Sequence, residues 1–157
     1  ISLDPNIRPG FIKDKQAHRG RIERMAAQSD IIKFSDEDLE WFDMPGDHDA
    51  LAAAWLGRGP KLVVITRGAD GALAYSASHK VEVPSQKVEV VDTIGAGDTF
   101  DAGVLAALSR AGLLTKADVA ALSESAIFDA LSLAAKVAAV TVSRAGANPP
   151  WAGEIGL

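Results

Sequence analysis

The chain has 157 residues, of which 48% are hydrophobic and 24% charged, and its formal net charge is −5. This composition is ordinary for a globular protein with its own core, and a negative balance without a Lys/Arg cluster argues against nucleic acid as the main partner. The chain has no cysteine, which excludes disulfides and thiolate zinc sites and is compatible with the cytoplasm, where we expect the protein. No run of about 18 apolar residues is evident, so we expect no membrane span and no membrane partner, and no basic apolar leader suggests secretion.

The chain opens on Ile1 rather than Met, in a segment that resembles a buried strand running into a turn at residues 4–6. A sequence that begins inside an element suggests a piece of a longer protein.

Apolar periodicity predicts alternating helices and strands as far as residue 83. The expected elements are a helix at 13–28, a strand at 30–34, a helix capped by Ser35 and running through Phe42, an Ala-rich helix at 49–56, a strand at 61–66, a turn at 68–71 and antiparallel strands at 72–76 and 80–83. Strands that alternate with helices favour an α/β layered sheet, and we expect a single domain over residues 1–157.

The remainder of the chain predicts a strand, a turn and two long helices. An apolar strand at 88–91 precedes a small-residue turn, and a helix at 98–111 follows that turn. A helical stretch covers 117–140, with a break near 123–125, and leads into a short extended piece at 141–144 and a loop at 146–150.

The turn Gly95-Ala96-Gly97 and the acid after it carry the strongest chemical signal. A turn without bulky side chains lets backbone N–H groups approach an anion, and a helix start adds unpaired donors and a positive dipole end. Asp98 would repel that anion unless it acts on a neighbouring group, such as a hydroxyl that must lose a proton to attack phosphorus. The alternative is an ordinary acidic residue at a helix start. The glycines match neither the Walker loop nor the dinucleotide fingerprint.

The longer string Asp92-Thr93-Ile94-Gly95-Ala96-Gly97-Asp98-Thr99-Phe100 closely resembles the C-terminal signature of the ribokinase-like (pfkB) sugar kinases. The resemblance implies that Gly95, Ala96 and Gly97 form an anion hole for the transferring phosphate. It also implies that Asp98 is the catalytic base and contacts the sugar hydroxyl. The implied fold is a ribokinase-like three-layer α/β/α sandwich, of which this chain carries the C-terminal half without the N-terminal half and lid. ATP and Mg²⁺ are the implied cofactors.

Residues 4–9, Asp-Pro-Asn-Ile-Arg-Pro, resemble a stretch of fructokinases and 2-keto-3-deoxygluconate kinases. The resemblance implies that Asn6 and Arg8 contact the sugar, at a strand end where α/β sheets place ligands. Alternatively, Asp4 and Asn6 stabilise a turn while Arg8 pairs with an acid.

Residues 32–37 resemble the family segment that organises phosphate, Mg²⁺ and water. Lys33 is then a candidate for nucleotide phosphate. Either Asp36 or Glu37 would serve Mg²⁺ through water, with Glu37 as the named candidate. An ordinary cap on a surface helix is the alternative.

Residues 66–72 resemble the family's nucleotide loop, which places Thr66 and Gly68 near the ATP phosphates and lets Gly71 shape the turn. A plain β-hairpin is the alternative. Ala135 stands where many relatives carry Asn or His beside the adenine, so alanine would offer only an apolar contact.

Asp92 and the late loop at 143–150 resemble the family's site for a monovalent cation, usually K⁺. The carbonyls of Ile94, Thr141, Arg144 and Gly146 would join Asp92, consistent with a hard cation that prefers oxygen. Pro150 replaces a serine ligand of one relative, so a need for K⁺ is left open. The alternative for Asp92 is an Asx turn.

The resemblance as a whole implies an ATP-dependent phosphotransferase that acts on a hydroxyl of a small sugar. Fructose is the first expectation, 2-keto-3-deoxygluconate the second, and ribose or a nucleoside the third. A non-catalytic nucleotide-binding module is the alternative from another class. The implied partner is a small-molecule sugar, and a homodimer of the complete protein is left open.

Overall fold

A computed structural model of the chain describes residues 1–156, which contain one five-stranded mixed sheet. The strands lie in chain order, and β1, β2 and β3 run parallel while β4 and β5 complete an antiparallel meander with β3. Their bounds are β1 (Ser2–Leu3), β2 (Ile31–Ser35), β3 (Leu62–Thr66), β4 (Ala72–Tyr75) and β5 (Lys80–Val83).

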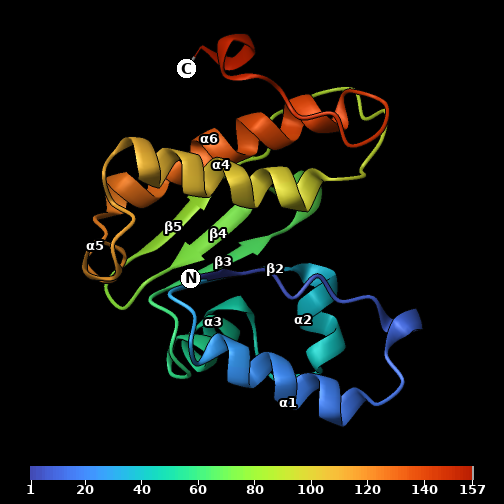
Figure 1. Cartoon of the computed structure of the whole chain (residues 1–157), viewed down its shortest axis with the longest axis vertical. Helices are drawn as coiled ribbons and strands as arrows, with labels where there is room; N and C mark the ends of the chain where they lie inside the picture. Colours follow the sequence, from blue (N-terminus) through green and yellow to red (C-terminus); the bar gives the residue numbers. More distant parts are fainter. Residues whose placement is uncertain (157) are drawn as a thin grey trace.

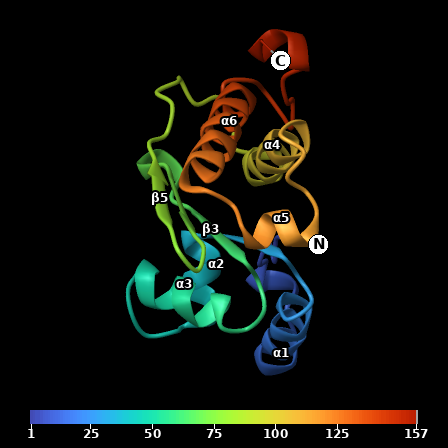
Figure 2. The same cartoon turned by 90° about the vertical axis from the view of Figure 1, so that its left-hand side faces the viewer.

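Helices cover both faces of this sheet (Figure 1). One face carries α1 (Lys15–Ala26), α2 (Asp36–Phe42) and α3 (His48–Leu56). The other carries α4 (Ala96–Arg110) and α6 (Glu124–Val142), which lie side by side in Figure 2 and are joined through the short α5 (Lys116–Ala120). Three short 3₁₀ turns lie at Pro9–Phe11, Gly68–Asp70 and Ala152–Ile155. The predicted α/β class with three layers is confirmed.

Strand alternation sends successive side chains into two separate cores. In β2, Ile31 packs toward α4 and α6, whereas Ile32 and Phe34 pack toward α1, α2 and α3. Lys33 therefore lies on the α4 face of β2, although it is a charged residue in a buried strand. This placement directs its side chain toward Gly97 at the start of α4.

Close packing of α4 on α6 depends on a helical glycine. A Cβ at Gly103 would lie 2.6 Å from the Cα of Ala134 and 2.7 Å from a methyl of Val137. The missing side chain lets the two helix backbones approach, which fixes α4, and with it the turn at its N-terminus, against the rest of the fold.

Two sequence predictions about local structure are wrong. Residues 88–91 form no strand, and Val88, Val90 and Val91 are exposed. The predicted extended piece at 141–144 is absent too, because α6 continues to Val142 and a turn follows at Ser143 and Arg144; within the helix the Thr141 hydroxyl donates to the Val137 carbonyl at 3.0 Å. The two errors are linked, since the N–H of Val91 donates to the carbonyl of Val142 at 2.8 Å, and so pairs with a helix end rather than with a strand.

The break expected at 123–125 is confirmed, since α5 ends at Ala120 and Ser123 caps α6 by accepting from the N–H of Ala126. By length and composition alone, the 19-residue α6 could cross a membrane, since an 18-residue stretch of it has a mean hydropathy of 1.6, contrary to the expectation that no segment could. In this structure its apolar side chains pack into the core that α4 and the sheet share, as in a core helix (Ile127, Ala130, Leu131, Ala134, Ala135).

Candidate active site

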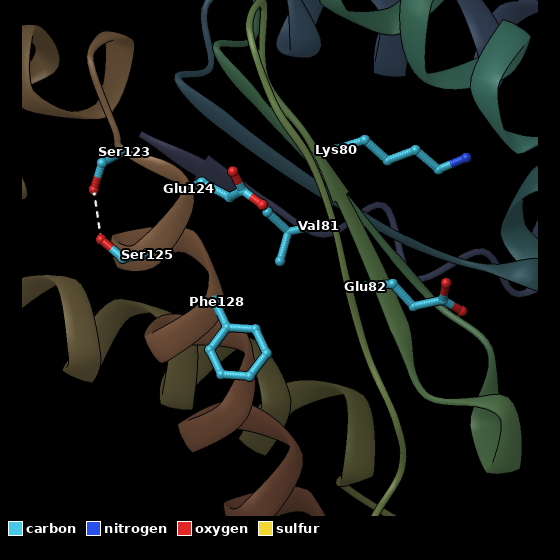
Figure 3. Close-up of a pocket in the computed structure, with 7 residues that line it drawn as sticks. All are labelled: Lys80, Val81, Glu82, Ser123, Glu124, Ser125 and Phe128. Carbon is cyan, nitrogen blue, oxygen red and sulfur yellow. Dashed lines mark hydrogen bonds between the residues drawn. The ribbon is translucent and has the colours of Figure 1, made fainter.

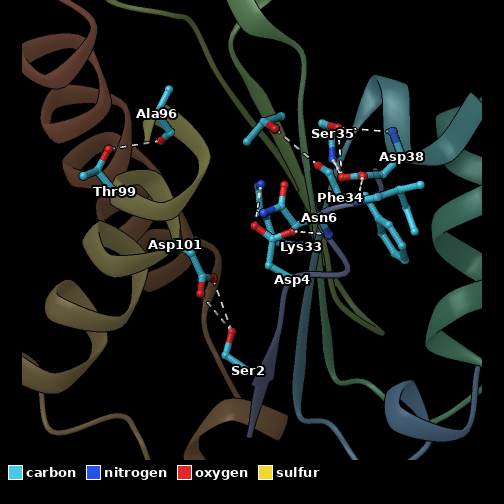
Figure 4. A network of polar contacts seen from close by, with 12 residues as sticks. Ser2, Asp4, Asn6, Lys33, Phe34, Ser35, Asp38, Ala96, Thr99 and Asp101 are labelled. Atoms are coloured by element: carbon cyan, nitrogen blue, oxygen red, sulfur yellow. Dashed lines mark hydrogen bonds and ion pairs between the residues drawn. The ribbon is translucent and has the colours of Figure 1, made fainter. Parts of the chain in front are cut away.

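The carboxyl ends of β1 and β2 meet the N-terminus of α4 (Figure 4). Because side chains alternate along a strand, Lys33 of β2 and Thr66 of β3 lie on the α4 face, and Asp4 follows β1 on the same side. Segments far apart in the sequence are thereby gathered at one edge, the place where parallel sheets bind ligands.

Lys33 and Asp4 form a nearly buried ion pair at this edge. The Lys33 Nζ donates to Asp4 Oδ2 at 2.9 Å, and the two side chains are 5% and 16% exposed. Asp4 Oδ1 accepts from the backbone N–H of Asn6 at 3.0 Å, which holds the carboxylate in place. A Cβ built on Gly97 would lie 3.0 Å from the Lys33 Nζ, so the ammonium is in contact range of the small-residue turn.

The turn itself presents unpaired backbone donors. Gly95 precedes α4 in the left-handed conformation at φ 78° and gives the helix no side-chain cap. Within residues 1–156, the N–H groups of Gly97 and Asp98 have no hydrogen-bond acceptor. The Thr99 hydroxyl donates to the carbonyl of Gly95 at 2.8 Å and stabilises the turn. Free N–H groups, the positive helix end and a lysine ammonium together favour an anion.

Asp98 lies in the first turn of α4 and is exposed, next to these donors. A solvent-facing carboxylate beside an anion site is placed to accept a proton from a group bound next to the anion. The structure thus brings together Gly95, Ala96, Gly97, Asp98 and Lys33, and their roles stay predictions.

Asp101, which the sequence analysis did not single out, lies on α4 close to this edge of the sheet. It lies one helical turn after Asp98, and its carboxylate accepts from the Ser2 hydroxyl at 3.2 Å (Figure 4). Burial raises the pKa of Asp101 above its usual value, although the Ser2 hydrogen bond opposes this shift. The charges of Asp4 and Asp98 also raise this pKa, and the charge of Lys33 lowers it. The spacing of three residues after Asp98 was the available signal, because i and i+3 share a helix face.

The predicted nucleotide loop connects β3 to the antiparallel β4, so it has the hairpin geometry that was the alternative. Gly71 adopts φ 87°, and a Cβ there would lie 2.1 Å from the carbonyl oxygen of Val83. Gly68 adopts φ 53° and is exposed. The Thr66 hydroxyl donates to the Phe34 carbonyl at 3.3 Å. A role for this loop in binding nucleotide stays a prediction.

Asp92 links the turn before α4 to the late loop. Its two oxygens accept the N–H groups of Ile94 at 3.0 Å and Gly146 at 2.9 Å, and these hydrogen bonds hold its pKa below the usual value. The carbonyl of Gly146 accepts the N–H of Asn148 at 2.9 Å, which leaves a second lone pair, whereas the carbonyl of Thr141 accepts from both Ser143 and Arg144. The Asx contact that was the alternative is therefore present, and a cation role for Asp92 and these carbonyls stays a prediction.

The sugar-contact candidates lie at the surface after β1. Asn6 is exposed at φ 44°, and its N–H bonds to Asp4, as in the turn-stabilising alternative. The exposed Arg8 donates to the carbonyl of Ile7 at 3.0 Å and pairs with no acid among the described residues.

The acid that the structure buries after β2 is Asp38, not Asp36 or Glu37. Asp38 is 3% exposed and accepts from the N–H of Ile7 at 2.7 Å and from Ser35. Glu37 is exposed, and Asp36 pairs with His48 at 3.0 Å. Asp38 thus ties the β1 loop to the cap of α2, a connection that the sequence pattern did not reveal. No group of three His, Cys, Asp or Glu side chains suited to a metal occurs among residues 1–156.

Two further features are the position of Ala135 and a hollow on the surface. Ala135 is 9% exposed and belongs to the core between α6 and the sheet. Figure 3 shows a hollow of about 590 Å³ that is lined by β5 and the start of α6. Lys80 lines this hollow, and its strand partner Tyr75 lies at the opposite end of β4 from Ala72.

Comparison with known proteins identifies the family of this chain. The pfkB family carbohydrate kinase description matches residues 2–152. A fructokinase of Rhizobium leguminosarum bv. trifolii is 68% identical over 127 residues, covering 81% of this chain and 39% of that protein.

Two solved structures have similar folds. Aminoimidazole riboside kinase from Salmonella enterica, complexed with aminoimidazole riboside and an ATP analogue, superposes with a TM-score of 0.78 at 30% identity, covering 93% of this chain and 46% of its own. A fructokinase double mutant from Vibrio cholerae O395, with fructose, ADP and potassium ion bound, also gives 0.78, at 29% identity and with 93% and 45% covered. The chain spans less than half the length of these three relatives. The ribokinase-like fold is confirmed, and the chain belongs to the pfkB family of carbohydrate kinases.

Proposed function

We propose that this chain carries the nucleotide site and catalytic base of an ATP-dependent sugar kinase, and that its sugar is fructose. The observation that carries the proposal is the placement of the Lys33 ammonium beside Gly97, where α4 begins with unpaired N–H groups and Asp98 follows. This arrangement combines an anion site with an adjacent base, the two parts that phosphoryl transfer to a hydroxyl requires.

In this proposal the γ-phosphate of ATP lies against the turn at residues 95–97. The N–H groups of Gly97 and Asp98 and the Lys33 ammonium stabilise the charge on the transferring group. Asp98 accepts the proton of the attacking sugar hydroxyl, and its exposure leaves room for that sugar. Thr66, Gly68 and Gly71 contribute the loop that faces the nucleotide.

Metal ions have supporting roles in the same proposal. Because the described residues hold no cluster of three metal-ligating side chains, Mg²⁺ would be held mainly by the nucleotide phosphates and water, and would neutralise their charge. Asp92, with the carbonyls of Ile94, Thr141, Arg144 and Gly146, supplies an oxygen set suited to K⁺. The Vibrio cholerae fructokinase was solved with potassium ion bound, which supports a monovalent cation here.

The choice of fructose rests on the 68% identical fructokinase, since equal fold similarity to a kinase of aminoimidazole riboside shows that the fold does not select the sugar. 2-Keto-3-deoxygluconate and ribose or a nucleoside are the competing acceptors. A cytoplasmic location, a small-molecule sugar as the partner and a homodimer of the complete protein belong to the same proposal.

A phosphotransfer assay on the complete protein tests the proposal. ATP, Mg²⁺ and K⁺ are supplied with fructose, 2-keto-3-deoxygluconate or ribose in separate reactions, and ADP release is followed with and without each sugar. We expect fructose to give the highest kcat/KM. Faster turnover of another sugar would reject fructose, and ATP binding without product from any sugar would favour a non-catalytic module.

A further inference from the structure

The predicted nucleotide loop between β3 and β4 has little packing of its own to hold its shape. Gly68, Ala69 and Asp70 form a single 3₁₀ turn, and all three are exposed. Gly71 follows at φ 87° with its backbone close against residues 83–85. Small exposed residues leave a backbone many accessible conformations, so the shape of this loop depends on the neighbouring segment that holds it.

Two side-chain contacts join this loop to β5 and to the residues that follow β5. Arg67 precedes the turn, and its Nη2 donates to Glu82 Oε1 at 2.6 Å and to the carbonyl of Asp70 at 2.8 Å. The Ser85 hydroxyl donates to the carbonyl of Ala69 at 2.5 Å. Glu82, which Figure 3 shows on β5, and Ser85 therefore hold the loop at two separate points.

The guanidinium of Arg67 is mostly buried, which increases the importance of its contact with Glu82. The Arg67 side chain is 18% exposed, whereas the Glu82 side chain is 61% exposed. The Arg67 Nε is buried and has no acceptor within residues 1–156. Because burial of an incompletely paired charged group costs free energy, the Glu82 carboxylate offsets the cost of keeping Arg67 in this place.

We propose that Glu82 is a positioning residue for the nucleotide, since through Arg67 it keeps residues 67–71 in the conformation that binds ATP. Ser85 supports the same conformation at Ala69. The inference rests on the proposed function, because it requires that this loop contacts ATP. A loop that is ordered before its ligand arrives avoids the ordering cost at binding, so both residues raise nucleotide affinity without touching the nucleotide. Neither of them belongs to the motif at 66–72.

The test removes the Glu82 charge by Glu82→Gln in the complete protein and measures the Kd of ATP by calorimetric titration without sugar. Arg67→Met and the double variant Arg67→Met/Glu82→Gln complete a double-mutant cycle. Glu124→Gln is the matched control, because Glu124 is an exposed glutamate that lines the same hollow as Glu82 but lies on α6. The KM values for ATP and for fructose are measured on each variant.

Glu82→Gln should weaken ATP binding about two- to fivefold, the range of a partly exposed ion pair, and raise the KM for ATP by the same factor. The KM for fructose and the kcat at saturating ATP should stay at their wild-type values, a split that a general loss of structure would not produce. In the Arg67→Met background, Glu82→Gln should have no further effect on ATP affinity. Ser85→Ala should weaken ATP binding about two- to fivefold by itself, and Glu124→Gln should leave it unchanged.

Unchanged or tighter ATP binding by Glu82→Gln would overturn the inference, and tighter binding would show that Glu82 competes with phosphate for Arg67. An equal effect of Glu82→Gln in the wild-type and Arg67→Met backgrounds would also overturn it, since Glu82 would then not act through Arg67. Failure of the proposed function gives a different result, in which the wild-type protein binds ATP but phosphorylates no sugar while the cycle of ATP affinities is still measured.

Discussion

Lys33→Met is the substitution that best separates the anion site from the fold. The methionine keeps most of the side-chain volume in β2 but removes the ammonium beside Gly97. In residues 1–156 the Lys33 Nζ makes one hydrogen bond, to Asp4, so two of its three protons remain for a ligand.

The expected loss of nucleotide affinity follows from the two Lys33 protons that remain for a ligand. A hydrogen bond to a charged group contributes about 1.5–3 kcal/mol, and each 1.4 kcal/mol is tenfold in affinity. Lys33→Met should therefore weaken ATP binding about 10- to 100-fold, as measured by calorimetric titration. It should also destabilise the fold by about 1–3 kcal/mol, less than for a fully buried pair, because Asp4 keeps its bond to Asn6 and is partly exposed.

The double variant Asp4→Asn with Lys33→Met is the control. It removes both charges, so the free energy of unfolding should recover toward the wild-type value while ATP affinity stays low. Recovery of affinity in the double variant would refute the reasoning, since Lys33 would then matter only through the fold. ATP affinity within about twofold of wild type in Lys33→Met itself would refute it as well.

Two further predictions concern the loops around the site. Gly71→Ala should lower the free energy of unfolding by about 3 kcal/mol or more, and the melting temperature by about 6–12 °C, because the new Cβ meets the Val83 carbonyl at a positive φ. Gly112→Ala, also at positive φ but in open space, should cost about 1 kcal/mol, and equal losses for the two would contradict the steric argument. Asp92 has a lowered pKa, so its stabilising contribution is present above the unfolded value of about 3.9 and is lost as pH falls through the lower folded value. The difference in melting temperature between wild type and Asp92→Asn should therefore shrink as pH falls below about 4, and a difference independent of pH would contradict the contacts described.

Much of the fold was predictable because local patterns and burial agree. The buried strand at 31–35, the Ser35 cap of α2 and the small-residue turn before α4 follow from apolar runs, capping chemistry and glycine conformations. The errors at 88–91 and 141–144 arose because apolar or β-branched residues resemble strands, whereas pairing is decided by neighbours distant in sequence. Val91 meets the end of α6, and no local pattern encodes that contact.

In the candidate site too, contiguous residues were predictable and contacts between distant residues were not. The residues of the anion turn are contiguous, so a motif could identify them together. Asp101, Asp38 and the Asp4 carboxylate gain their importance from Ser2, Ile7 and Lys33, which lie between 29 and 99 residues away. Such partners depend on strand register and helix packing, so their pairing becomes visible only in three dimensions.

The most direct test of the central claim is the turnover of Asp98→Asn in the complete protein. The substitution keeps the size and the helix start but removes the base, so kcat should fall by about 10²-fold or more while ATP affinity, measured on the same preparation, stays within a few-fold of wild type. Full turnover by this variant would contradict the account, because the proton of the sugar hydroxyl would then have another acceptor.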